Sequence, residues 1–514
     1  MLFNSYAFLL LFLPATLAGF FLVARWGKEA GAAWLAASSL FFYAWWDHRY
    51  LVLLLSSICV NYLAGSYIAR NANQSRGKKV LVIAIATNLA LLGYYKYADF
   101  FVANANALLG TEWPLFRVIL PIGISFFTFT QIAFLADAYV GKVTEYRFIN
   151  YVLFVTYFPH LIAGPVLHHR EMMPQFEDDR NYRLSSSSIA IGLTIFAIGL
   201  AKKVLIADNL AAYVTPVFAA DAEVPSLLVA WGGALAYTFQ LYFDFSGYSD
   251  MAIGLSRLFG VRLPLNFASP YRASSIIEFW RRWHMTLSRF LRDYLYIPLG
   301  GNRKGPLRRH VNLLTTMVLG GLWHGAGWNF VIWGALHGAF LVANHSWQKI
   351  RSPLPLDLSR RVTSVFGVTL TFTCVVFAWV YFRAPDLVSA NRIVLGMIGL
   401  HGIAIPEAMA SRLSFFWPVL QDLGVREFLG GGRAFVETWV WVSIGATIAF
   451  FCPNTQQIMS RYEPALVEAG GGVSDASQRL AWQPRRRDAV IVGLLFAMGI
   501  LALNRPTEFL YFQF

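Results

Sequence analysis

Long apolar runs separated by short polar turns dominate the pattern of this chain. Each run holds about 15 to 21 residues with few charges, which is close to the length that a helix needs to cross a bilayer. The pattern therefore predicts an all-α polytopic membrane protein, a multi-helix bundle. We expect its spans at 6–23, 32–46, 51–68, 80–95, 119–139, 188–206, 227–245, 362–380, 435–451 and 489–503.

Several further segments depart from this simple pattern. The run 151–162 is followed by a Gly/Pro break. The segment 259–275 carries Pro264 and Pro270 and is not expected to cross the membrane. The run 311–323 breaks at Gly325-Ala-Gly327 and resumes over 328–344, while 391–405 predicts a partial or interfacial helix. We find no short-period repeat and expect one membrane domain over residues 1–514.

Basic residues gather in some of the turns and predict which side they face. They follow the first run, continue after the third, and recur at 303–309 and 485–487. Such turns face the cytoplasm under the positive-inside rule, which places both chain ends on the outer side of the membrane. The first run has no basic segment before it, so we expect an uncleaved span and not a signal peptide.

The composition agrees with a chain surrounded by lipid. Of 514 residues, 57% are hydrophobic and 14% charged, whereas soluble domains carry about 25% charged residues. A net charge of +14 is compatible with nucleic-acid binding. Many of the basic residues lie in short turns between apolar runs, so they indicate membrane topology, and no nucleic-acid partner is expected. Cys59, Cys374 and Cys452 lie far apart and predict buried thiols, without a disulfide framework or zinc spacing.

Two Trp-His pairs, Trp283-His284 and Trp323-His324, stand out in this apolar sequence. Ionisable groups at membrane depth are costly and are functional candidates by default. A buried, neutral histidine can accept and return a proton near neutral pH. If the glycines after His324 interrupt the helix, that residue lies at a cavity wall, so it is the stronger candidate base. Interfacial packing of both pairs is the alternative.

The segment around the first pair predicts an amphipathic helix over 275–295. Glu278 and Arg282 are four residues apart and predict a helical ion pair. Helical spacing also places a set of residues on one face: Trp280, Trp283, His284 and Ser288. His337 lies in the apolar run 328–344, and we expect it to be a packed, hydrogen-bonded helix histidine.

Acidic residues in or beside apolar runs form a second group of candidates. Asp244 and Asp250 flank Ser246, and they either neutralise Arg281 or Arg282 or line a substrate path. Asp137 lies near the end of a span, either at the interface or paired inside the bundle.

Two weaker motifs contain residue types that can bind a metal ion or an anion. His168-His169 with Glu171 lacks another ligand at a usual spacing, so no metal is expected. The basic cluster from Arg303 to Arg309 either attracts an anionic cytosolic donor or acts as a topology signal alone.

Several motifs in order resemble the membrane-bound O-acyltransferase family, in its bacterial exopolysaccharide branch. The resemblance reaches both ends of the chain. The motifs are Phe158-Pro-His-Leu-Ile-Ala-Gly-Pro165, Tyr242-Phe-Asp-Phe-Ser-Gly-Tyr-Ser-Asp250, Phe279-Trp-Arg-Arg-Trp-His284, Arg292-Asp-Tyr-Leu-Tyr-Ile-Pro-Leu-Gly-Gly301, Gly321-Leu-Trp-His-Gly325 and Trp333-Gly-Ala-Leu-His-Gly338.

The resemblance implies helices around a central cavity or tunnel, with re-entrant and interfacial segments. It implies acetyl-CoA as the cytoplasmic donor, His324 as the catalytic histidine and His284 as a second, less uniform position. Other residues are expected to support the substrate path: Trp323, Trp283, Asp244, Ser246, Arg281, Arg282 and Asn329.

The resemblance also implies partners. These are a periplasmic or membrane-anchored esterase-like acetyltransferase and a polysaccharide synthase or secretion complex, acting on alginate, cellulose or a similar polymer. The shared motifs leave open a D-alanyl or other acyl transfer to a cell-envelope polymer. From the residues alone, a proton-coupled transporter and a structural subunit also stay open. The group that would stabilise an oxyanion is not identified.

Overall fold

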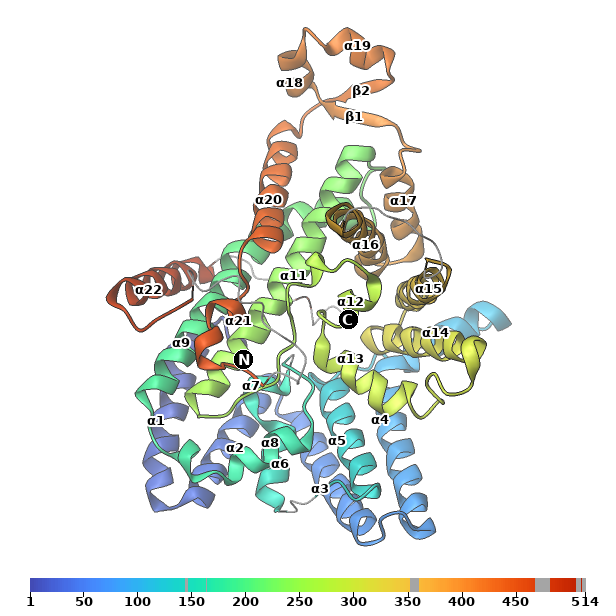
Figure 1. Ribbon diagram of the computed structural model, residues 1–514. Coiled ribbons are helices and arrows are strands. Elements are labelled where there is room, and N and C mark those ends of the chain that lie inside the picture. Colours follow the sequence, from blue (N-terminus) through green and yellow to red (C-terminus); the bar gives the residue numbers. More distant parts are fainter. Residues whose placement is uncertain (144–146, 163, 352–359, 467–480, 505–509, 511–514) are drawn as a thin grey trace.

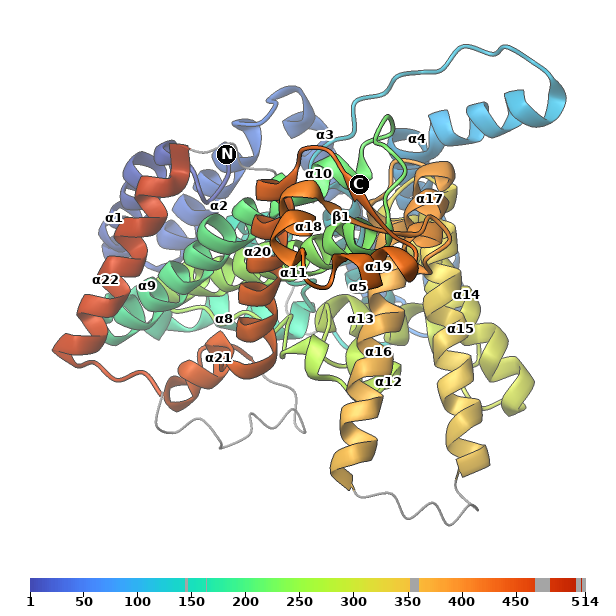
Figure 2. The ribbon, with the colours of Figure 1, turned by 90° about the horizontal axis from the view of Figure 1, so that it is seen from above.

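The fold is a bundle of helices that run between two faces (Figures 1 and 2). It is a computed structural model that describes residues 1–143, 147–162, 164–351, 360–466, 481–504 and 510. Seven described helical runs are long and apolar enough to cross a membrane. The predicted all-α membrane fold is thus confirmed. These runs are Ala7–Trp26, Arg49–Arg70, Ser75–Leu109, Ser186–Phe218, Val362–Arg383, Gly432–Phe451 and Arg486–Asn504.

The N-terminal part is a set of antiparallel helices near the predicted runs. The fourth is far longer than the apolar stretch 80–95, because its second half continues on polar and aromatic residues that pack on later helices. The elements are η1 (Ala7–Phe12), α1 (Leu13–Val23), η2 (Ala24–Trp26), α2 (Lys28–Ala44), α3 (Arg49–Arg70), α4 (Ser75–Leu109) and α5 (Ile124–Tyr139).

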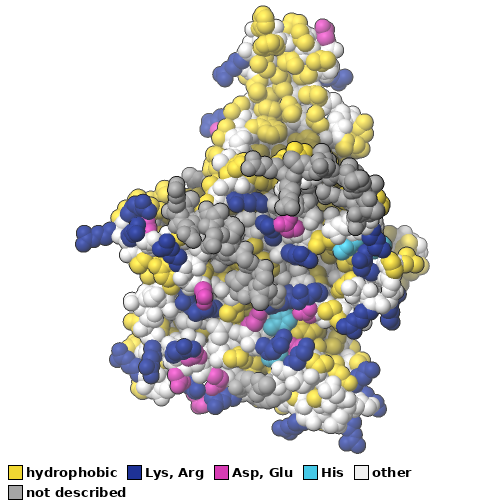
Figure 3. Space-filling model, in the orientation of Figure 1, with side chains coloured by type: hydrophobic (Ala, Val, Ile, Leu, Met, Phe, Trp, Pro, Cys, Tyr) yellow, Lys and Arg dark blue, Asp and Glu magenta, His cyan; other side chains and the backbone are white. Residues whose placement is uncertain are grey.

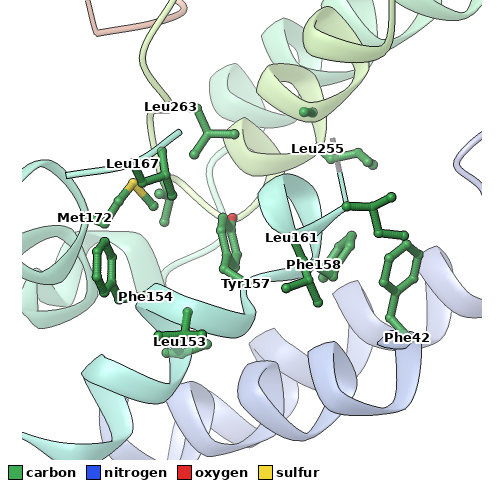
Figure 4. Close-up of a cluster of buried hydrophobic side chains, with 14 of the residues drawn as sticks. Phe42, Leu153, Phe154, Tyr157, Phe158, Leu161, Leu167, Met172, Leu255 and Leu263 are labelled. Carbon is green, nitrogen blue, oxygen red and sulfur yellow. The ribbon is translucent and has the colours of Figure 1, made fainter. Parts of the chain in front are cut away.

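Short helices fill the space between α2 and α5. Their aromatic and aliphatic side chains form the centre of the larger hydrophobic core (Figure 4). Phe158, which is fully buried, packs its ring against Phe12 and Phe42. None of these four elements is longer than nine residues, which is too short for a helix to cross a bilayer. The elements are α6 (Phe148–Thr156), α7 (Phe158–Leu161), α8 (His169–Glu177) and η3 (Asp179–Tyr182).

The centre of the molecule is the close antiparallel contact of α9 (Ser186–Ala201) with α11 (Leu227–Leu258). Glycines seven residues apart on each helix face one another: Gly192 meets Gly254, and Gly199 meets Gly247. A Cβ on Gly254 would lie 2.6 Å from the Gly192 carbonyl oxygen. Small residues let helix backbones approach closely in membranes, so this glycine seam fixes how the two helices cross.

Beyond the seam, the chain of α9 continues as a π-helix and another α-helix: η4 (Lys202–Ala207) and α10 (Asp208–Phe218). Lys202, Lys203 and Asp208 lie here, inside the helical run Ser186–Phe218, and Lys203 is 1% exposed. Single-turn π segments inside helices are frequent at functional sites.

The predicted helix 275–295 is broken in two. The chain forms η5 (Pro270–Arg272), α12 (Ile276–Trp280), a turn, α13 (Met285–Leu291) and η6 (Arg292–Tyr296). The break falls at His284, which has a φ of 42° in the left-handed region. The expected shared face of Trp280, Trp283, His284 and Ser288 is therefore wrong. The ion pair of Glu278 with Arg282, at 2.5 Å, is confirmed.

The apolar runs 311–323 and 328–344 form two helices that are separated at the predicted glycine break. Helix α14 (Gly305–His324) ends at the glycine break, and α15 (Trp328–Arg351) follows it. A Cβ on Gly334 of α15 would clash with the backbone of Met317 in α14. The two helices therefore also touch through a glycine.

The C-terminal part adds spans at the predicted places and a lobe that the sequence did not predict. The lobe projects from the bundle at the top of Figure 1, and two parallel strands pair at its base. The elements are α16 (Arg360–Arg383), α17 (Leu387–Met397), β1 (Ile403–Pro406), α18 (Glu407–Ala410), η7 (Ser411–Leu413), α19 (Trp417–Asp422), β2 (Val425–Phe428), α20 (Gly432–Phe451), α21 (Thr455–Ile458), η8 (Ser460–Tyr462), α22 (Arg486–Leu501) and η10 (Ala502–Asn504).

Lysines and arginines gather on the face where α1 ends and α22 begins, which we call the basic face (Figure 3). The glycine-rich turn at 299–305 lies at the N-terminal end of α14, opposite the end that carries His324. The cysteine prediction was wrong. Cys59 and Cys452 are exposed on the outside of the bundle and Cys374 is half-buried, because apolar positions here also face outward.

The glycine seam generates a stability prediction. Replacing Gly254 by Val pushes a side chain into backbone atoms of α9, so we expect a clear drop in the melting temperature of the detergent-solubilised protein. Overpacking costs about 1–3 kcal/mol. The control is Gly93→Val in α4, where an added Cβ meets nothing within 4 Å. Equal melting temperatures for the two variants would show that the close contact at the glycine seam does not contribute to stability.

Candidate active site

A small cavity lies between α11, the turn that follows α12, the end of α14 and α16. Its volume is about 20 Å³, enough for roughly one water molecule. His324 and Asp244 are the polar members of an otherwise apolar lining. The lining residues are Leu241, Asp244, Phe245, Trp283, His324, Trp379, Phe382 and Leu510. The structure thus brings together three of the predicted site residues: His324, Asp244 and Trp283.

His324 reaches this cavity because its helix stops there. It is the last residue of α14, and Gly325 follows in an extended conformation. A Cβ on Gly325 would collide with the ring of Phe330, so the tight turn requires glycine. The imidazole packs edge-on against Trp333 and Phe382, with ring centroids 5.2 and 5.1 Å away. The predicted break and the cavity-wall position are confirmed.

The end of α14 is capped by two side chains from α4. Lys96 Nζ donates to the carbonyl oxygens of Trp323 and His324, at 2.5 and 2.9 Å. The hydroxyl of Tyr97 donates to the carbonyl of Leu322 at 2.6 Å. The last carbonyls of a helix have no partner within it, and a cation there also suits the helix dipole. Sequence analysis missed both residues, although a lone lysine beside an apolar run was a usable signal.

His284 is held rigidly by Asn266, another residue that the sequence analysis did not single out. Asn266 Oδ1 lies 3.0 Å from His284 Nδ1 and accepts from the backbone N–H and hydroxyl of Thr286. Because an amide oxygen can only accept, Nδ1 of His284 must carry a proton. These bonds over-determine the left-handed backbone of His284.

In the neutral form of His284, the Nε2 atom is therefore the one with a free lone pair. Nε2 is buried and has no hydrogen-bond partner among the described residues. The ring centroid lies 6.4 Å from that of His324. The two histidines of the Trp-His pairs are thus neighbours, although they come from different elements.

Asp244 is paired with lysine and not with arginine. Its carboxylate lies 2.5 Å from Lys203 Nζ, and Lys203 also contacts Asp208 at 2.7 Å. Asp250 pairs in the same way with Lys202 at 2.6 Å. The predicted partners, Arg281 and Arg282, were therefore wrong. The π-helix η4 brings two adjacent lysines to α11, which no local pattern reveals.

The two arginines lie away from the cavity. Arg281 is exposed, and Arg282 is bound to Glu278. Burial opposes the charge of Glu278, but hydrogen bonds from Ser274 and Arg282 outweigh it and hold the pKa of this carboxyl below its usual value. These groups brace the turn before His284.

The remaining predicted support residues have packing roles. Trp323 stacks on Phe129, with centroids 5.2 Å apart, and does not line the cavity. Asn329 donates to the Ala384 carbonyl at 2.9 Å and ties α15 to the end of α16. Ser246 is buried on α11 outside the cavity lining. His337 is packed among aromatic rings as expected, but neither ring nitrogen has a hydrogen-bond partner among the described residues.

The His168-His169 motif belongs to a separate polar cluster. Asp137 is 4% exposed and accepts from the hydroxyl of Tyr294 at 2.9 Å, so of the two alternatives it is paired inside. His169 lies 3.3 Å from Asp137, while Arg289 binds Glu171. Among the described residues, no group of three or more metal-type ligands is found. The cluster joins η6 to α5 and α8.

The arrangement of the cavity suits proton transfer. It offers one imidazole at a water-sized void, a second imidazole nearby with a defined tautomer, and a carboxylate fixed by lysine. A positioned histidine of this kind can accept a proton from an attacking hydroxyl.

Comparisons with known proteins point to the same chemistry. The chain is 39% identical to a probable alginate O-acetylase of Pseudomonas putida, over the full length of both proteins. It is 43% identical to a peptidoglycan O-acetyltransferase of Helicobacter pylori, over 79% of this chain and 81% of that one. A teichoic acid D-alanyltransferase of Streptococcus thermophilus is 26% identical over 51% of this chain and 68% of its own length.

The family profile agrees with these relatives. It covers residues 40–383, from α2 to the end of α16, and so includes both Trp-His pairs and the cavity lining except Leu510. The predicted resemblance is confirmed. This chain belongs to the membrane-bound O-acyltransferase family, and it is an O-acyltransferase.

Proposed function

We propose that this protein moves an acetyl group from cytoplasmic acetyl-CoA across the bacterial inner membrane for O-acetylation of a secreted or cell-envelope polysaccharide. The observation that carries the proposal is His324 at the cavity of a chain that resembles an alginate O-acetylase from end to end. A periplasmic or membrane-anchored esterase-like partner would pass the group to the polymer. Alginate and peptidoglycan are the polymers that the relatives' names suggest.

The distribution of charge supports this orientation. Lysines and arginines on the basic face suit the cytoplasm, where an anionic donor such as acetyl-CoA is found. The hydroxyl of Tyr6, at the start of the first span, donates to the Ile500 carbonyl near the end of α22. In this orientation the start of the first span and the end of α22 lie at the periplasmic side.

In the proposed reaction, His324 accepts one proton and later returns it. A ring nitrogen of His324 takes the proton of the acceptor hydroxyl as its oxygen attacks the thioester carbonyl. The tetrahedral intermediate collapses and the C–S bond breaks. The thiolate then takes the proton from the imidazolium, which leaves an acetyl ester, free CoA thiol and neutral His324. His284 stands beside it as a positioning residue.

D-alanyl transfer is the second candidate. The observation that favours it is the similarity to teichoic acid D-alanyltransferases, which covers half of this chain at 26% identity. Acetyl transfer ranks first because the similarity to O-acetyltransferases is both longer and higher.

Replacing His324 by Ala tests the catalytic assignment. In cells whose own copy of the gene is deleted, we expect the alkali-released acetate of surface polysaccharide to fall by at least about 100-fold, since general-base catalysis supplies about 10²–10⁴-fold. The control is His310→Ala, in the same helix but at its basic end. If the His324 variant kept the normal amount of acetate, His324 would not be the general base. Alkali-released D-alanine in place of acetate would favour the second candidate.

Replacing Lys96 by Met tests the helix cap. The apolar side chain leaves two carbonyls of α14 without their donor and frees the backbone of His324, so we expect acetyl transfer to fall by about 10-fold or more. Small displacements of a catalytic group have effects of this size. Lys78→Met in the same helix, at the basic face, is the control. Full activity of the Lys96 variant, at equal protein level, would contradict the positioning role.

A further inference from the structure

We propose that Asn266 is a positioning residue of the acyl-transfer reaction, which fixes His284 as a hydrogen-bond acceptor and thereby orients the imidazole of His324. The inference rests on the proposed function and deepens it. It goes beyond the histidine pair because it assigns a purpose to a buried amide in the segment that follows α11, and it states which hydrogen bonds set the direction of the base.

The contacts of the Asn266 side chain decide which of its two ends is the acceptor. The backbone N–H of Val166 donates to the hydroxyl oxygen of Thr286 at 2.9 Å, so the proton of that hydroxyl is free to be donated onward. The hydroxyl lies 3.0 Å from Asn266 Oδ1, and the backbone N–H of Thr286 approaches the same atom at 3.4 Å. Because both groups are donors, this atom is the amide oxygen. The amide nitrogen donates in another direction, to Ser249 Oγ at 3.4 Å.

The fixed amide oxygen sets the tautomer of His284. The Nδ1 atom of the ring lies 3.0 Å from Asn266 Oδ1 and must therefore carry the ring proton. In the neutral imidazole the other nitrogen, Nε2, then has only a lone pair to offer. Nε2 is buried and has no hydrogen-bond partner among the described residues. A buried acceptor without a donor is rare in proteins, which makes this atom a candidate for a bond that forms during the reaction.

The position of the ring shows what that bond can reach. The ring centroid of His284 lies 6.4 Å from that of His324, and the two rings interact electrostatically. A ring nitrogen lies about 1 Å from its centroid, so nitrogens of the two rings are at least about 4 Å apart, too far for a direct hydrogen bond. A single oxygen atom can bridge such a gap by accepting from His324 and donating to Nε2.

The small cavity offers a place for the bridging oxygen. It is lined by His324 and by Phe245, whose ring packs edge-on against that of His284 with the centroids 4.8 Å apart. Its volume of about 20 Å³ is enough for roughly one water molecule. A water molecule or a substrate hydroxyl in this cavity therefore lies beside both imidazoles.

The resulting chain of hydrogen bonds orients the base. Asn266 accepts from Nδ1 of His284, Nε2 accepts from the bridging oxygen, and that oxygen accepts from one ring N–H of His324. The second ring nitrogen of His324 then has its lone pair free for the proton of the acceptor hydroxyl, in the way that a third group orients the base of a catalytic triad. The thiolate later removes this same proton from the imidazolium.

An uncharged amide suits this place better than a carboxylate. Three cationic or titratable groups act electrostatically on His324, namely Lys96, His284 and His337. A positive charge on any of them opposes the imidazolium that forms on His324. A carboxylate at position 266 would favour a second proton on the His284 ring, whereas the amide leaves that ring neutral.

The turn that carries His284 has backbone supports of its own. The N–H of Met285 donates to the Asn266 carbonyl at 3.0 Å, and the N–H of Ala268 donates to the Arg282 carbonyl at 2.9 Å. These bonds do not involve the amide group, so a substitution of the Asn266 side chain should leave the turn in place.

The test uses Asn266→Leu, with Thr286→Val as the matched control. Leucine has nearly the shape of asparagine but cannot accept the Nδ1 proton, so both ring tautomers of His284 become accessible. Valine at position 286 removes a hydroxyl that donates to the same amide oxygen, but it leaves Asn266 bound to His284. Each variant loses hydrogen bonds of the turn, so the melting temperature should fall in both.

Two readouts separate positioning from stability. Nitrogen NMR of the protein isotopically labelled at histidine reports the tautomer of His284, whose signals are assigned by their loss in His284→Gln. The transfer of radiolabelled acetyl from acetyl-CoA, measured in membrane vesicles of the producing cells and divided by the amount of folded protein, gives kcat and KM.

We expect the proton of His284 on Nδ1 in the unmodified protein and in Thr286→Val, which should also keep its kcat. Asn266→Leu should show a mixture of tautomers and a kcat lower by about 10-fold or more, since a wrong tautomer costs a serine protease about 10⁴-fold. KM for acetyl-CoA should stay unchanged, because Asn266 acts on the base and not on the donor.

A second pair of variants covers poor folding of Asn266→Leu. Glutamine at position 284 can place an amide oxygen near the position of Nε2, whereas asparagine there can only donate toward Asn266. His284→Gln should therefore be several-fold more active than His284→Asn. Asparagine tolerates the left-handed backbone of this residue better, so a higher activity of the glutamine variant cannot come from better folding.

Three results would overturn the inference. They are a proton on Nε2 of His284 in the unmodified protein, an unchanged tautomer or kcat in folded Asn266→Leu, and equal activities of the two variants at position 284. Absence of acetyl transfer by the unmodified protein would overturn the proposed function instead, and the tautomer of His284 would still be measurable.

Discussion

The architecture depends on the close contact of α9 and α11. Two pairs of facing glycines let these helices approach until their backbones touch. That approach, followed by the π-helix η4, delivers two adjacent lysines to two acids on α11. Buried charges of this kind are tolerated only when they are paired, so the glycine seam and the ion pairs require each other. Asp244 is thereby fixed at the cavity.

A second constraint holds the histidine itself. An interrupted helix inside a membrane protein leaves carbonyls that must find donors, because lipid offers none. Lys96 and Tyr97 supply them at the end of α14. On the other side, Asn266 satisfies His284 and its neighbours. The two imidazoles thus lie on irregular backbone, which polar side chains from distant segments stabilise. These hydrogen bonds keep the site rigid although its backbone is not part of a regular helix.

Local sequence rules succeeded where the local chain decides the structure and failed where distant groups do. The glycine break after His324 was predictable because Gly325 and Gly327 disrupt a helix wherever they stand. The helix over 275–295 was not broken in the prediction, because its spacing is helical and the residue that forces the turn, Asn266, lies far back in the chain. Asp244 was assigned to Arg281 or Arg282 because those arginines belong to a conspicuous motif, although sequence position does not show which cation a buried acid meets. The lysine that pairs with it, Lys203, lies about 40 residues earlier, on another helical segment.

The sequence by itself determined that this protein is a membrane bundle, which face carries the basic charge and which histidines to examine. Apolar run length, glycine breaks and Trp-His motifs are properties of neighbouring residues, and they carry that information without any fold. Only the tertiary structure decided that His284 and His324 share one site, that Lys96 caps the helix of His324, and that Asp244 joins the cavity. Each of these is a contact between distant segments, set by how closely helices pack and by the need to pair every buried charge.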